Sequence, residues 1–105
     1  MGKHSRRKQE RLAEKLVQIR VALNLSQNGM LRHLGLNEEM PRTSISNYEL
    51  GVREPPLFVL LQYAQAAGVS TDVLIDDALD LPAKLPSIPK HEKVRLKLKS
   101  NVKRD

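Results

Sequence analysis

Apolar residues recur near the start of the chain at the spacing of one helix face. They are separated by four, three and four residues in the run Leu12, Leu16, Ile19 and Leu23. This period predicts an amphipathic helix whose other faces carry Arg11, Lys15 and Gln18. Asn24 can end this helix, because asparagine tolerates the left-handed conformation found at helix ends.

A second helix is predicted from Gln27 to Leu34. Ser26 is a residue type that caps helix N-termini with its hydroxyl, and Gly35 is the type that ends helices. The inward side chains of this helix would be Met30, Leu31 and Leu34. A polar connection follows over residues 36–41.

A short third helix is predicted to run to about Leu50, where Gly51 closes it. Ile45 and Tyr48 supply its apolar side. Its outward face carries small polar side chains, namely Thr43, Ser44, Ser46 and Asn47. Such a face is typical of a helix that enters the major groove of DNA, because small side chains allow close approach and polar ones can bond base edges.

Two further helices are predicted after a pair of prolines. Pro56 can open the first of them, Gly68 ends it, and its apolar positions are Leu57, Leu60, Leu61 and Ala64. Ser70 or Thr71 caps the last helix, whose apolar content is Val73, Leu74 and Ile75. We interpret the acids Asp76, Asp77 and Asp80 as a solvated face. The predicted fold class is all-α, with five helices.

The pattern divides the chain into three segments. We expect a basic N-terminal arm over residues 1–10, the helical domain over residues 11–81, and a linker with a basic tail over residues 82–105. Pro82, Pro86 and Pro89 predict a stiff linker. In the tail, apolar residues fit both a period of two and a helical face, and a lone strand would have no partner. The tail is therefore expected to be disordered in the free monomer or ordered by a partner.

Charge is concentrated at the two ends of the chain. The total of +6 divides into +5 for residues 1–25, −1 for residues 26–55, −3 for residues 56–89 and +5 for residues 90–105. Basic ends suit a polyanion such as DNA or RNA, although they can equally be solvated tails that keep a protein in solution. Aromatic residues are scarce at 3%, which disfavours single-stranded nucleic acid because its bases stack on aromatic side chains.

Several classes of chemistry lack the residues they need. The chain has no cysteine, so disulfides, zinc fingers and thiol catalysis are excluded. Its three histidines show no ligand spacing, so no metal site is expected. We find no catalytic constellation and no glycine-rich phosphate loop, and expect neither an enzyme nor a cofactor. With no signal-peptide pattern and no apolar stretch that could span a membrane, a cytoplasmic protein is expected.

The ordered set of short motifs resembles the phage repressor and Cro family of helix-turn-helix proteins, also called the XRE family. The resemblance covers roughly residues 12–79. It is carried by Ile19-Arg20, Leu25-Ser26-Gln27, the run from Ile45 to Gly51, Pro55 four residues later, and the run from Ala66 to Leu74. It implies a lambda-repressor-like domain and a sequence-specific regulator of transcription that binds double-stranded DNA, usually as a homodimer.

The resemblance also implies roles for particular residues. Arg20 and Glu49 would form a buried ion pair that ties the first helix to the third. The amide of Gln27 would touch DNA phosphate, and Arg53 would grip phosphate. The candidates for reading bases are Arg42, Thr43, Ser44, Ser46 and Asn47. Arg42 could instead reach phosphate, and Thr43 could instead cap the third helix, which would place Arg42 outside it.

Two departures from the family pattern leave a second function open. The stretch between Gly35 and Ile45 is about four residues longer than the usual turn, and Leu31 stands where the family prefers alanine. Either departure could mean that the third helix is shifted, or that DNA binding is lost while the fold is kept. The alternative is a protein-interaction module, antitoxin-like or a phage accessory protein, that meets a protein partner through residues 82–105.

Overall fold

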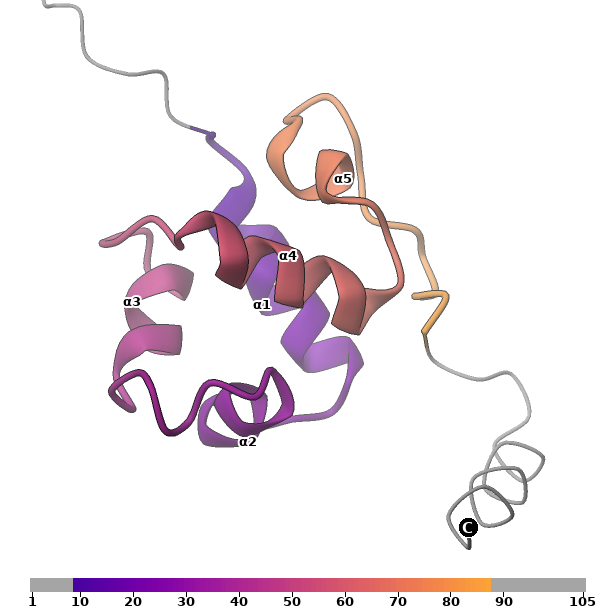
Figure 1. Cartoon of the computed structure of the whole chain (residues 1–105). Helices are drawn as coiled ribbons and strands as arrows, with labels where there is room; N and C mark the ends of the chain where they lie inside the picture. The colour runs from indigo at the N-terminus through magenta and orange to yellow at the C-terminus, as the bar shows by residue number, and fades with distance from the viewer. Residues whose placement is uncertain (1–8, 88–105) are drawn as a thin grey trace, which may run out of the picture.

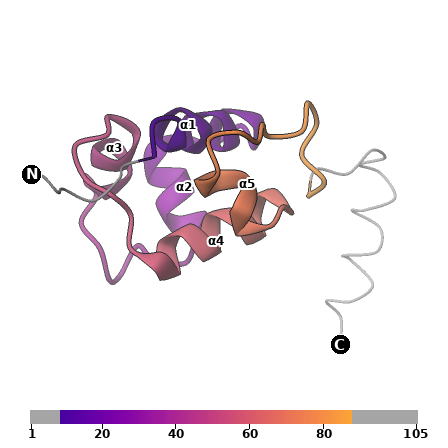
Figure 2. The ribbon, with the colours of Figure 1, turned by 90° about the horizontal axis from the view of Figure 1, so that it is seen from above.

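A computed structural model of the chain describes residues 9–87. This part contains five helices and no strand: α1 (Leu12–Ala22), α2 (Gln27–His33), α3 (Ser44–Glu49), α4 (Leu57–Ala67) and α5 (Thr71–Ile75). The all-α prediction is confirmed. In both views of the ribbon α3 and α5 lie at opposite ends of the molecule (Figures 1 and 2). The expectations for residues 1–8 of the N-terminal arm and for the tail from residue 88 concern segments outside the described residues.

The helix ends follow the chemistry of the residues at them. The hydroxyl of Ser26 accepts a hydrogen bond of 2.9 Å from the amide of Gly29, which caps α2 as predicted. Asn24 has a φ of 62° after α1. Gly68 has a φ of 78°, and a Cβ there would lie 2.8 Å from the backbone nitrogen of Ser87. Glycine is therefore required at Gly68 both by the backbone conformation and by a close neighbour.

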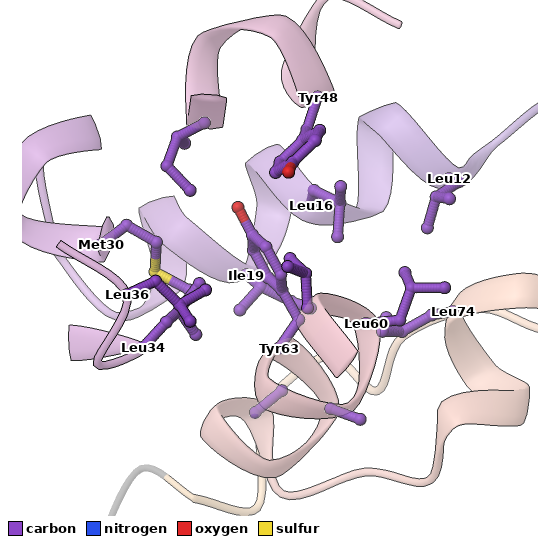
Figure 3. Packing of buried hydrophobic residues seen from close by; sticks show 14 of the residues in the cluster. Leu12, Leu16, Ile19, Met30, Leu34, Leu36, Tyr48, Leu60, Tyr63 and Leu74 are labelled. Carbon is purple, nitrogen blue, oxygen red and sulfur yellow. The ribbon is translucent and has the colours of Figure 1, made fainter. Parts of the chain in front are cut away.

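The core is built mostly from the predicted apolar positions, although Leu57 and Leu61 of α4 are exposed. Leu16 and Ile19 of α1, Met30 of α2 and Ile45 of α3 are all fully buried. Leu16, Ile19 and Met30 gather around Tyr63 of α4, which is also fully buried (Figure 3). Each helix thus contributes to one continuous cluster, and α3 is fixed to it by Ile45 and Tyr48.

The long connection between α2 and α3 is a folded turn. The carbonyl of Leu36 accepts hydrogen bonds of 3.0 Å from the amides of Glu39 and Met40. The side chain of Leu36 is buried in the core, and Met40 packs against the same cluster. The additional residues are therefore anchored at both ends, and they set the point at which α3 begins.

A buried lysine joins α1 to the end of α5. Lys15 is fully excluded from solvent, and its ammonium donates hydrogen bonds to the carbonyl oxygens of Val73 (2.7 Å) and Asp76 (3.0 Å). The prediction that Lys15 lies on an outer face is wrong. Its long stem carries the charge across the bundle to carbonyls at the end of a helix, which lack donors within the helix.

The acidic segment after α5 binds the start of α1. The carboxylate of Asp77 accepts hydrogen bonds from the amides of Glu10 (2.9 Å) and Arg11 (3.1 Å). Arg11 donates to the carbonyl of Asp77 at 2.8 Å and pairs with Asp80 at 2.5 Å. The interpretation of this segment as a solvated face holds for Asp80, which is exposed and pairs with Arg11 at the surface, but not for Asp77, which is half-buried. We call Arg11, Lys15, Asp77 and Asp80 the α1–α5 clasp.

The packed unit also extends beyond the predicted boundary at residue 81. Leu85 is 4% exposed and belongs to the core cluster, and the amide of Ser87 donates to the carbonyl of Ala67 at 3.3 Å. Leu85, which lies between Pro82 and Pro86, reaches the core from this stretch. Residues 82–87 are thus part of the domain and not a free linker.

Acid should weaken the α1–α5 clasp at Asp77. The backbone amides of Glu10 and Arg11 lower the pKa of the Asp77 carboxyl below its usual value, so its contribution to stability is present above the unfolded pKa of about 3.9 and is lost as pH falls through the lower folded pKa. We expect Asp77→Asn to be less stable than wild type at neutral pH and to lose less stability in that acid range. Denaturant unfolding across pH measures both effects.

Glu38→Gln, which removes a charge from an exposed turn, is the control and should keep the wild-type pH profile. If Asp77→Asn also kept the wild-type pH profile, the assignment to Asp77 would be contradicted.

The hydroxyl of Tyr63 is buried without a hydrogen-bond partner among residues 9–87. In Figure 3 it points into the core on the side of α3, and burial raises the pKa of this hydroxyl. An unpaired buried hydroxyl costs free energy that phenylalanine does not incur.

Tyr63→Phe should therefore keep the stability of the domain or increase it, by up to about 1 kcal/mol. Thermal and denaturant unfolding measure the change. Tyr48→Phe is the comparison, because the hydroxyl of Tyr48 has a weak contact of 4.0 Å with the sulfur of Met40. A clear loss of stability in Tyr63→Phe would mean that its hydroxyl is paired in solution.

Candidate nucleic-acid interface

The orientation of α3 is fixed at its last residue by an ion pair. Glu49 ends α3 and its side chain is 6% exposed. The guanidinium of Arg20 donates from Nε to Oε2 at 2.7 Å and from Nη2 to Oε1 at 3.1 Å. The paired carboxylate raises the pKa of Arg20. The ion pair implied by the family resemblance is thus present in the two-point geometry that favours arginine over lysine.

The same carboxylate reaches α2. The amide nitrogen of Gln27 donates to Oε1 of Glu49 at 3.0 Å, and Nη1 of Arg20 donates to the carbonyl of Leu25 at 3.0 Å. We call Arg20, Gln27 and Glu49 the Glu49 network. It joins α1, the start of α2 and the end of α3, so one buried carboxylate adds to the apolar core in fixing the relative placement of these helices.

The outward face of α3 is smaller than predicted. Ser46 and Asn47 are half-buried, and Arg42 and Thr43 are exposed. Ser44 is 6% exposed and lies among the buried residues of the helix. The prediction that Ser44 faces outward is wrong, because one turn of helix places Ser44 above Tyr48 on the inward side.

The bounds of α3 bear on the alternative in which Thr43 caps the helix. The helix begins at Ser44, so Arg42 lies outside it and Thr43 occupies the capping position. The Thr43 side chain makes no capping hydrogen bond. Both side chains are therefore presented from the turn that enters α3 rather than from its regular face.

The turn after α3 folds back onto the helix. The carbonyl of Asn47 accepts hydrogen bonds from the amides of Val52 (3.0 Å) and Arg53 (3.2 Å), and Gly51 supplies the positive φ of 75° that this turn needs. Arg53 is exposed, and it is held beside the helix that carries Ser46 and Asn47. Charges of both signs surround α3, since Glu38 and Glu39 are exposed on the turn before it.

Sequence reasoning missed the bond between Gln27 and Glu49. The two residues are 22 positions apart, and no local pattern links them. The available signal was chemical: a buried carboxylate with one arginine still has room for a further donor. Gln27 was expected to face phosphate, whereas in the structure its amide nitrogen donates a hydrogen bond to Glu49.

The described part of the chain contains neither a metal-binding cluster nor a membrane-spanning helix. Residues 9–87 contain no group of three histidine, aspartate or glutamate side chains that could hold a metal ion. No helix within the same residues is long and apolar enough to cross a membrane.

Comparison with known families agrees with this geometry. Residues 13–79 match the family described as "Helix-turn-helix domain", a match that begins within α1 and ends after α5. Comparisons with curated proteins and with solved structures found no match. Because the match covers more than half of the chain, this protein belongs to the helix-turn-helix domain family, whose members bind DNA.

Proposed function

We propose that this protein is a sequence-specific regulator of transcription that binds double-stranded DNA as a homodimer. The observation that carries the proposal is the fixed placement of α3. Its inner face is buried through Ile45 and Tyr48 and its last residue is held by the Glu49 network. A helix held in this way can present small polar side chains to a major groove without reorganising.

The exposed and half-buried residues around α3 have distinct roles in this proposal. Asn47 suits the N6 and N7 edge of adenine, and Ser46 and Thr43 can bond to either kind of base pair. Arg42 lies before the helix, where its long side chain can reach guanine or phosphate. Arg53 contacts phosphate, because the turn after α3 holds it at the edge of this face.

Selection of preferred duplexes from a random pool tests the proposal and supplies a site for further measurement. On that site, Asn47→Ala should lower affinity by about 1–3 kcal/mol and relax the preference at one base position. Arg53→Ala should weaken binding to all sequences and reduce the slope of log affinity against log salt by about 0.9. Gln18→Ala, on the exposed side of α1, is the control and should change neither. Selection that yields no preferred sequence would contradict the proposal.

A second copy of the chain is the proposed partner of an apolar surface beside α3. Five large apolar side chains are 46–83% exposed along the end of α3, the following turn and the first turns of α4: Leu50, Val52, Leu57, Phe58 and Leu61. Leu57 and Leu61 were among the apolar positions predicted for the fourth helix, and both are exposed. Regulators of this kind read two half-sites about one helical turn apart, so a self-complementary surface next to the recognition helix is where a two-fold dimer would form.

Leu57→Glu should convert the dimer to a folded monomer. Leu57 is 83% exposed, so the substitution should leave the stability of the domain nearly unchanged while it places charge in the interface. Sedimentation equilibrium over a range of concentrations measures the mass, and binding to one against two half-sites measures the loss of cooperativity. Val21→Glu, at another exposed apolar position, is the control. A wild type that stays monomeric both free and on its selected site would contradict the dimer.

The alternative of a protein-interaction module has less support. It relied on residues 82–105 as a segment that the domain does not use. Residues 82–87 are packed on the domain through Leu85 and the amide of Ser87, which leaves residues 88–105 as the part that would meet a protein partner.

A further inference from the structure

We propose that residues 90–105 bind the phosphate backbone of the duplex that α3 reads, and that they supply the largest share of the salt-dependent affinity. The inference rests on the proposed function and deepens it. It assigns sequence preference to the folded domain and charge attraction to the C-terminal segment. This division follows from how the domain uses its own charges.

The folded domain carries a negative net charge. Residues 9–87 contain seven basic and ten acidic side chains, a net charge of −3, although the whole chain carries +6. A protein gains affinity for a duplex by neutralising several phosphates with lysine and arginine and releasing their counterions. A domain of net charge −3 is instead repelled by the duplex at long range. The attraction has to come from basic residues outside this part of the chain.

Three of the seven basic side chains are also used inside the domain. Arg20 and Arg11 each pair with a carboxylate, and Lys15 is buried against backbone carbonyls. These three are not available to phosphate. The exposed basic side chains that remain within residues 9–87 are Arg32, Arg42, Arg53 and Lys84.

The surroundings of α3 are close to neutral. Arg42 and Arg53 flank the helix on its two sides, and the turn before it carries the exposed acids Glu38 and Glu39. The acids after α5 lie at the opposite end of the domain from α3 (Figure 1). The domain can therefore read base edges with small neutral side chains, but it holds few cations for the phosphates that border the groove.

The C-terminal segment has the complementary composition. Residues 90–105 contain seven basic and two acidic side chains, and the twelve residues from Lys93 to Arg104 contain six basic residues and no acid. Lysine meets a phosphate as a point charge, and phosphate contacts carry no sequence information. An acidic protein would match the same charges, but it would leave the domain without the cations that a duplex requires.

This segment starts from a fixed point within reach of α3. Leu85 is buried, and the amide of Ser87 donates to the carbonyl of Ala67 at the end of α4. The 11 residues of α4 span only about 16 Å. The 18 residues after Ser87 can span up to about 60 Å when extended. Because they are tethered to the domain, their effective concentration at a bound duplex is high.

Salt-dependent titration of the full chain tests the inference. Lys97→Gln combined with Lys99→Gln removes two positive charges from the C-terminal segment. On the selected duplex, the slope of log affinity against log salt should fall by about 1.8, so the loss of affinity should be about tenfold larger at 50 mM than at 200 mM salt. The loss should be the same on a duplex without the preferred sequence, because phosphate contacts do not read bases.

A matched pair of substitutions in the domain separates phosphate contact from net charge. Gln65→Glu combined with Ala83→Glu lowers the net charge by the same amount at two exposed positions, and it should keep the wild-type salt slope. Circular dichroism establishes that both double variants are folded at the temperature of the titration.

Two results would overturn the inference and leave the proposed function standing. One is an equal fall of the salt slope in the matched pair, which would make the effect one of net charge. The other is a wild-type slope in the variant at Lys97 and Lys99, which is the outcome expected if this segment meets a protein instead of the duplex. A wild type that shows the fall in slope but prefers no sequence would overturn the proposed function.

Discussion

The ion pair between Arg20 and Glu49 is the constraint on which the outward face of α3 depends. A helix of six residues is too short to be stable alone, so its direction has to come from its neighbours. An acidic residue at a helix C-terminus is also electrostatically unfavourable, and Glu49 is acceptable there because Arg20 compensates its charge. Ile45 and Tyr48 fix one side of α3, and the ion pair fixes its end.

At the opposite end of the domain, charged side chains stabilise the fold. The α1–α5 clasp uses charged side chains to satisfy backbone groups. Lys15 donates to carbonyls at the end of α5, and Asp77 accepts from the amides before α1. Leu85 belongs to the same hydrophobic core. Because the first turn of α1 lies in the clasp and its last turn carries Arg20, α1 connects the clasp with the ion pair that holds α3.

Local pattern was sufficient for the helices and insufficient for the partners of charged residues. Spacing of apolar residues, Ser26 and the glycines placed all five helices, because these signals act within a few residues. The roles of Lys15 and Asp77 depend on groups 58 to 67 positions away. The spacing of apolar residues cannot predict such distant pairs. Ser44 was misplaced because a polar residue next to the first turn of a short helix gives no sign of which side it occupies. The family resemblance implied the Arg20–Glu49 pair, but the bond from Gln27 to Glu49 is evident only in the folded structure.

The most direct test of the central claim is a titration of the isotopically labelled protein with its selected duplex, followed by backbone and side-chain amide resonances. We expect the largest changes on residues 42–53 and on the side-chain amide of Gln27, while the resonances of the α1–α5 clasp stay near their free positions. Changes centred on α5 and residues 76–87, with α3 unaffected, would contradict it.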